Sequence, residues 1–135
     1  MRFVSLVVIV FGAVCSLIAL AHIAMGPAAI PGSVPVNATM DSEDRFYATL
    51  FLGFGAAMVW SGMDLANRRP VLGALLIVFF LGGLARIISW IAVGPPIGLF
   101  IVLGAVELVL PPLLWYWSSY ALKKHDKNVV AGNDT

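Results

Sequence analysis

The sequence predicts an all-α integral membrane protein, an antiparallel bundle of four transmembrane helices with both termini in the cytoplasm. Hydrophobic residues make up 61% of the 135 residues and charged residues only 11%, whereas a soluble domain has about 45–50% apolar and about 25% charged residues. Four apolar stretches are each long enough to cross a bilayer. The basic residues, finally, gather on one side of the resulting topology.

Each expected span supplies the roughly 20 mainly apolar residues that a transmembrane helix needs. A long loop rich in Pro and Gly joins the first two spans, and short connections join the others. The polar segment after the last span is expected to be a disordered tail. The spans are residues 3–25, 46–65, 71–93 and 97–120, in a membrane domain of residues 1–122 that is followed by the tail 123–135.

The positions of Lys and Arg predict the orientation, because short cytoplasmic loops of membrane proteins carry an excess of these residues. Outside the spans, only Arg45 falls on the other side of the bilayer. We therefore expect cytoplasmic termini and a multi-pass protein of the cell (inner or plasma) membrane. The basic residues that share the cytoplasmic side are Arg2, Arg68, Arg69, Lys123, Lys124 and Lys127.

A cleavable signal peptide is the alternative interpretation of the first span. Arg2, the apolar run and Ala19-Leu20-Ala21 resemble the three parts of such a signal. However, the apolar run is longer than the roughly 7–15 residues that a signal peptide uses. We therefore interpret the segment as a membrane span.

Composition and motifs disfavour several function classes. The formal net charge is +1, and no clustered basic face predicts a nucleic-acid partner. The single cysteine, Cys15, cannot form an internal disulfide and has no ligand spacing for a metal. The sequence also has no H-E-x-x-H motif and no serine elbow. We assign no catalytic residue, no metal and no cofactor.

Two charged residues lie inside expected spans, Arg86 in the third and Glu107 in the fourth. Charges inside a bilayer are costly, and they are usually paired or functional. At 1.5 Å per residue, Arg86 lies roughly 10 Å and Glu107 roughly 15 Å from the outer ends of their helices. A tight Gly-Pro-Pro turn makes these helices neighbours, so the sequence predicts a salt bridge between the two side chains.

Polar residues at the outer ends of the first two spans are expected to extend this pair into a pocket. Gly82 would leave room beside the guanidinium. Pro111 has no N–H and would free the carbonyl of Glu107. Asp41 and Asp44 are assigned instead to the N-terminus of the second helix, Asp41 as its cap. The residues of the candidate pocket are Glu43, Arg45, Arg86, Ser89, Glu107, His22 and Asn37.

From Gly26 to Trp117 the chain carries the motifs Pro31-Gly32, Pro35, Asn37, Ser42-Glu43-Asp44-Arg45-Phe46-Tyr47, Gly82-Gly83-Leu84-Ala85-Arg86, Ser89, Gly94-Pro95-Pro96 and Glu107. In these motifs it resembles a family of small bacterial membrane proteins catalogued as domain of unknown function 4345. The resemblance implies a four-helix membrane fold and a bacterial source, and it brings no activity. Within the candidate pocket, the family pattern matches Glu43, Arg45, Arg86, Ser89 and Glu107.

These observations favour an accessory or ligand-binding membrane protein that holds a lipid or small polar molecule in the outer-half pocket. The alternatives are a small proton-coupled transporter and a membrane enzyme acting on a lipid. The charged cluster could also serve only to lock the helices in register. Besides the lipid bilayer, the expected partners are a lipid or small polar ligand and either a larger membrane complex or further copies of the chain.

Overall fold

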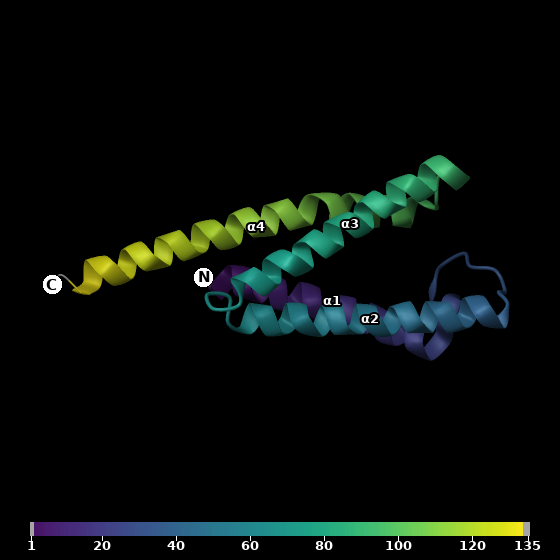
Figure 1. Cartoon of the computed structure of the whole chain (residues 1–135), viewed down its shortest axis with the longest axis horizontal. Helices are drawn as coiled ribbons and strands as arrows, with labels where there is room; N and C mark the ends of the chain where they lie inside the picture. Colours follow the sequence, from purple (N-terminus) through teal and green to yellow (C-terminus); the bar gives the residue numbers. More distant parts are fainter. Residues whose placement is uncertain (1, 134–135) are drawn as a thin grey trace.

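The protein, described here by a computed structural model, consists of helices joined by loops. The structure describes residues 2–133 for the backbone and 2–124 for the side chains. Within that range, four α-helices are long and apolar enough to cross a membrane. This confirms the all-helical class and fits a multi-pass membrane protein. The elements are α1 (Arg2–Met25), the short 3-10 helix η1 (Gly26–Ala29), α2 (Ala38–Met63), α3 (Arg69–Val93) and α4 (Gly98–Asn133) (Figure 1).

Helix α2 begins at Ala38, well before the expected start at Phe46. Asn37 caps this helix, because its side-chain oxygen accepts a hydrogen bond from the Met40 N–H at 2.9 Å. The prediction that Asp41 is the cap is therefore wrong, since Asp41 lies within the first turns. Hydropathy marks only the part of a helix that faces lipid, whereas capping decides where the helix begins.

Helix α4 also extends beyond the expected span. It has 36 residues, which corresponds to a length of about 54 Å, against a hydrocarbon core of about 30 Å. The helix continues to Asn133, through most of the polar segment 123–135 for which the sequence predicts disorder. Asp134 and Thr135 lie outside the described residues.

Small residues bring α1 and α2 close together. A Cβ atom on Gly12 would lie 2.7 Å from the carbonyl oxygen of Gly55, and one on Gly55 would lie 2.8 Å from the carbonyl oxygen of Gly12. Only glycine permits this approach of two backbones. Gly53, two residues earlier on α2, has no atom within 4 Å of such a Cβ, so it does not belong to the interface.

Helices α3 and α4 form the second closely packed pair. A Cβ atom on Gly83 would lie 2.9 Å from Leu108 Cδ2. Toward the start of α3, Arg69 Nη2 donates a hydrogen bond to Ser119 Oγ at 2.6 Å. The guanidinium of Arg69 also lies over the Trp115 ring, 4.3 Å from its centroid. These contacts join α3 to α4 along most of the length of α3.

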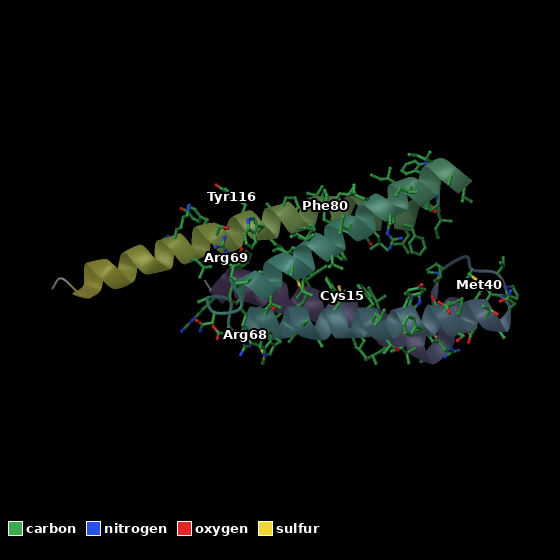
Figure 2. The ribbon with its side chains drawn as sticks, in the orientation of Figure 1. Cys15, Met40, Arg68, Arg69, Phe80 and Tyr116 are labelled. Atoms are coloured by element: carbon green, nitrogen blue, oxygen red, sulfur yellow. The ribbon has the colours of Figure 1, made fainter. Side chains whose placement is uncertain are left out.

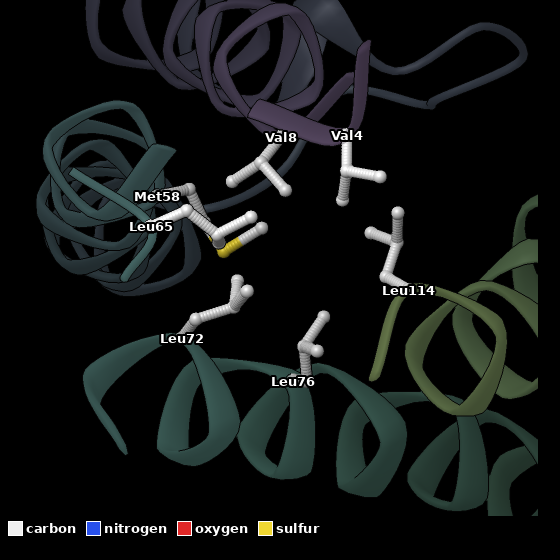
Figure 3. Packing of buried hydrophobic residues seen from close by; sticks show 7 residues of the cluster. All are labelled: Val4, Val8, Met58, Leu65, Leu72, Leu76 and Leu114. Carbon is white, nitrogen blue, oxygen red and sulfur yellow. The ribbon is translucent and has the colours of Figure 1, made fainter. Parts of the chain in front are cut away.

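The two pairs meet around one buried apolar cluster (Figure 3). This cluster combines the start of α1, the end of α2, the start of α3 and one residue of α4. Farther along α3, Phe79 packs against Phe54 at 5.6 Å and Phe11 at 5.1 Å between ring centroids. Figure 1 shows the pairs close together near the α2–α3 connection and apart toward the α3–α4 connection. The buried residues of this cluster are Val4, Val8, Met58, Leu65 (in the α2–α3 connection), Leu72, Leu76 and Leu114.

Candidate functional site

The predicted ion pair between α3 and α4 is present. Arg86 Nε donates a hydrogen bond to Glu107 Oε2 at 2.7 Å. The Glu107 side chain is 11% exposed, whereas the Arg86 side chain is 41% exposed. The carboxylate is thus enclosed by protein, while one edge of the guanidinium faces outward.

Two glycines allow these side chains to meet. A Cβ atom on Gly83 would lie 3.0 Å from Glu107 Cβ, so this glycine sets how closely α4 approaches α3. Gly104 lies against the Arg86 side chain, with 3.5 Å from its Cβ position to Arg86 Cδ. Gly82, which was expected to make room for the guanidinium, has nothing within 4 Å of a Cβ. That expectation is therefore wrong, and Gly104 has the role instead.

The guanidinium of Arg86 retains unused donors. Of its three nitrogens, only Nε donates a hydrogen bond to another described residue, although a guanidinium carries five N–H donors. The Phe100 ring lies beside it, with 5.4 Å from its centroid to Arg86 Cζ. The free edge presents two nitrogens in the geometry that suits a carboxylate or phosphate. Within a bilayer, such donors need an oxygen partner.

A second polar cluster joins the end of α1 to the start of α2. His22 Nδ1 lies 3.1 Å from Asp44 Oδ2. Arg45 Nε donates a hydrogen bond to Asp41 Oδ2 at 2.9 Å. Asp41 and Asp44 are therefore site residues that sequence reasoning assigned only to the helix terminus. Their spacing could have identified the Arg45 pair, because Asp41 and Arg45 are four residues apart and share a helix face.

Arg45 also ties α2 to the last turn of α1. Its Nη1 donates hydrogen bonds to the carbonyl oxygens of Ile23 and Ala24, two acceptors that α1 leaves free at its C-terminal end. The chain then turns at Gly26, which has a φ of 61°. A Cβ there would lie 3.0 Å from Arg45 Nη2. Glycine thus provides both the left-handed conformation and the space for Arg45.

The remaining candidates lie outside these two clusters. Asn37 serves as the α2 cap. Glu43 and Ser89 are exposed and make no side-chain hydrogen bond among the described residues. Within residues 2–124, no hydrogen bond or ion pair connects the Arg45 cluster to the Arg86 pair. A single pocket that contains all seven candidates stays a prediction. His22 and Arg45 lie in one cluster, and Arg86 and Glu107 form the other.

Among the described residues, no group of three or more His, Cys, Asp or Glu side chains could hold a metal ion. Cys15 is buried within the helices. The chemistry that these clusters offer is hydrogen bonding and charge. The side chains of Arg86 and Arg45 are similarly exposed, at 41% and 40%, but Arg86 donates a hydrogen bond through Nε alone, whereas Arg45 uses all three of its nitrogens.

Comparison with known families identifies the family to which the chain belongs. The family model for the domain of unknown function 4345 (DUF4345) matches residues 3–118. The chain belongs to the DUF4345 family. This confirms the resemblance drawn from the motifs, and the matched region of the DUF4345 protein contains both polar clusters. No curated protein and no solved structure matches the chain.

Proposed function

We propose that this DUF4345 protein is an accessory, ligand-binding protein of the bacterial inner membrane, and that Arg86 binds the anionic group of a lipid or small polar molecule. In the orientation that the basic residues favour, the helices run antiparallel, both termini are cytoplasmic and Arg86 lies in the outer half of the bilayer. The observation that supports this function is the half-exposed guanidinium, which uses only Nε for Glu107.

The charges around Arg86 suit such a ligand. Glu107 offsets the charge of Arg86 and reduces the cost of holding it in the membrane, which is about 2.5–3.5 kcal/mol for an unpaired Arg at the centre of a helix. The free guanidinium edge is then available for a bidentate contact with a carboxylate or phosphate. Apolar side chains such as Phe100 next to this edge favour an amphiphile over a fully polar molecule.

A proton-coupled transporter is less well supported. Such a transporter needs a carboxylate inside the membrane that has no permanent cationic partner, because this group must bind protons and cargo in turn. Glu107 has Arg86 at 2.7 Å. For this alternative to hold, Glu107→Gln should abolish proton-driven transport while the protein still folds.

A lipid-directed enzyme also lacks part of its machinery. The contact between His22 and Asp44 resembles the orientation of a general base by a carboxylate. Among the described residues, however, His22 makes no hydrogen bond with a Ser, Thr or Cys side chain that it could activate. The pair instead connects α1 to α2.

The proposal is tested by extracting the protein in polymer nanodiscs without detergent and identifying the molecules that remain bound by mass spectrometry. We expect a stoichiometric anionic lipid or a small carboxylate or phosphate, lost in Arg86→Gln. Arg45→Gln serves as the matched control, since it removes a membrane-end arginine from the other cluster. Equal bound content in wild type and Arg86→Gln would overturn the proposal. If a second protein is bound in stoichiometric amount instead, the chain is a subunit of a larger complex.

A further inference from the structure

An apolar groove lies between α3 and α4, in the half of the molecule opposite to Arg86. Its volume is about 370 Å³. It spans from Gly73 to Phe80, about 10 Å along the α3 axis, and Ile77 is 63% exposed at its mouth. The groove therefore opens toward the lipid. Its lining residues are Gly73, Leu76, Ile77, Phe80, Pro111, Pro112 and Trp115.

Glycine and proline shape the walls of this groove. Gly73 has no side chain, and the Trp115 ring occupies the place of one, with 2.9 Å from the Gly73 Cβ position to Trp115 Cζ3. Pro111 and Pro112 lie within α4, where their compact rings cover less of the neighbouring helix than longer side chains would. A volume of about 370 Å³ over about 10 Å of length corresponds to a smaller cross-section than that of a helix, which is about 10 Å across. The groove therefore suits one extended hydrocarbon chain better than another helix.

One end of the groove carries positive charge. Arg69 lies one turn before Gly73 on α3, and Figure 2 shows it near the start of the helix, with Phe80 farther along. Its Nη2 donates to Ser119 and its buried Nε has no hydrogen-bond partner. Lys123 lies one turn beyond Ser119 on the corresponding face of α4. Two helices thus each place a cation at the same end.

We infer that this groove binds one acyl chain of an anionic phospholipid, and that Arg69 and Lys123 bind the phosphate of its headgroup. The basic end lies at the α2–α3 connection, which is the cytoplasmic side in the orientation proposed above. Headgroups lie at this level, and Trp and Arg are typical of the interface. The anionic lipids of the cytoplasmic leaflet carry a negative charge, which complements the positive charge at the basic end of the groove.

A second copy of the chain fits this face less well. A two-fold dimer about the membrane normal places identical surfaces opposite each other. Such a dimer would bring the Arg69 and Lys123 ends of both copies together, with like charges in contact. A phospholipid offers an apolar tail and a negative headgroup in the order that the groove requires.

The test uses a variant in which Trp60, Trp90 and Trp117 are replaced by Phe, so that Trp115 alone reports on the groove. Its fluorescence is measured in phosphatidylcholine vesicles that contain phosphatidylglycerol or phosphatidylcholine with a quenching label on the acyl chain. We expect several-fold stronger quenching by the labelled phosphatidylglycerol. The preference should be lost in Arg69→Gln, and it should fall in Lys123→Gln.

Lys124→Gln is the matched control, because it removes the same charge from a neighbouring position on a different face of α4. It should keep the preference, as should Arg86→Gln, since this site is independent of the Arg86 pair. Equal quenching by both lipids would overturn the inference. So would an equal loss in Lys124→Gln and Lys123→Gln. Quenching that disappears as the protein density rises would show that a second copy covers the groove.

Discussion

At the scale of single residues, the site depends on unequal exposure of two charges. Glu107 is enclosed and Arg86 is half exposed, although the two share a hydrogen bond of 2.7 Å. Burying a carboxylate without a partner is costly, so each residue stabilises the other. The same arrangement leaves the outer edge of the Arg86 guanidinium available. Nε then makes the structural contact with Glu107, and the other two nitrogens are free to contact a ligand.

A double-mutant cycle measures the structural part of this arrangement. Arg86→Ala and Glu107→Ala should each lower the free energy of unfolding, because each leaves an unpaired charge in the bundle. Their combination should cost less than the sum of the single changes, with a coupling energy of about 0.5–3 kcal/mol. Reversible unfolding in mixed micelles provides the measurement, and strictly additive effects would contradict the pair.

The ion pair could be predicted from the sequence, because the cost of charge in a membrane limits where Arg86 and Glu107 can find partners. The spacing of Asp41 and Arg45 also carries a signal for their ion pair, whereas the contact of His22 with Asp44 could not be predicted. That contact depends on the start of α2 at Ala38, which places Asp44 on a turn that packs beside α1. Apolar patterning gives no signal for the polar first turns of α2. For this reason the predicted start of the helix was too late, and Asp41 was predicted as the cap instead of Asn37.

At the scale of helices, close approach depends on which glycine faces the neighbour. Spacing along α3 puts Gly82, Arg86 and Ser89 on one face. That spacing predicted that Gly82 makes room for the guanidinium, which is wrong. The contact with α4 is made by Gly83. The sequence shows which residues share a face, whereas the direction of the neighbouring helix decides which face is covered. The same limitation applies to Gly53 and Gly55 on α2.

Alanine at these two neighbouring positions tests the α3–α4 contact. Gly83→Ala should destabilise the protein by about 1–3 kcal/mol, because its Cβ would meet Leu108 at 2.9 Å. Gly82→Ala is the control, since nothing lies within 4 Å of its Cβ. It should be neutral or stabilising by up to about 1 kcal/mol through helix propensity. Thermal unfolding of both variants gives the comparison, and a reversed order would place α4 against the other glycine.

Helices α1 and α2 permit the same comparison. Gly55→Ala should loosen or displace the pair, because its Cβ would lie 2.8 Å from the Gly12 carbonyl oxygen. Gly53→Ala should leave it intact. A cysteine pair placed across the α1–α2 interface would report the difference as a change in cross-linking yield. Equal yields in both variants would contradict the interface.

At the scale of the whole molecule, contact between the two helix pairs is concentrated near the α2–α3 connection. Val4, Met58, Leu72 and Leu114 are buried there, while Ile88, Ile91 and Val93 near the end of α3 are exposed. Helices that meet over only part of their length leave much apolar surface to the lipid. This arrangement suits a protein whose polar group at Arg86 is reached from the side.

The orientation of the molecule is tested by cysteine labelling in a Cys15→Ser background. Ser33→Cys lies in the loop before α2, and Asn67→Cys lies in the α2–α3 connection; both positions are exposed. The positive-inside distribution predicts that a membrane-impermeant maleimide labels Ser33→Cys in intact spheroplasts. Asn67→Cys should react only after the membrane is permeabilised. The opposite pattern would invert the topology and move Arg86 to the cytoplasmic half.

The most direct test of the proposed binding role is the Arg86→Lys variant, with bound ligand and melting temperature measured on the same preparation. Lysine keeps the positive charge that pairs with Glu107, but it lacks the planar fork for bidentate contacts. The account predicts that the melting temperature stays close to that of the wild type, while the stoichiometric anionic ligand is lost. Retention of the ligand in Arg86→Lys and in Arg86→Gln would show that Arg86 only joins α3 to α4.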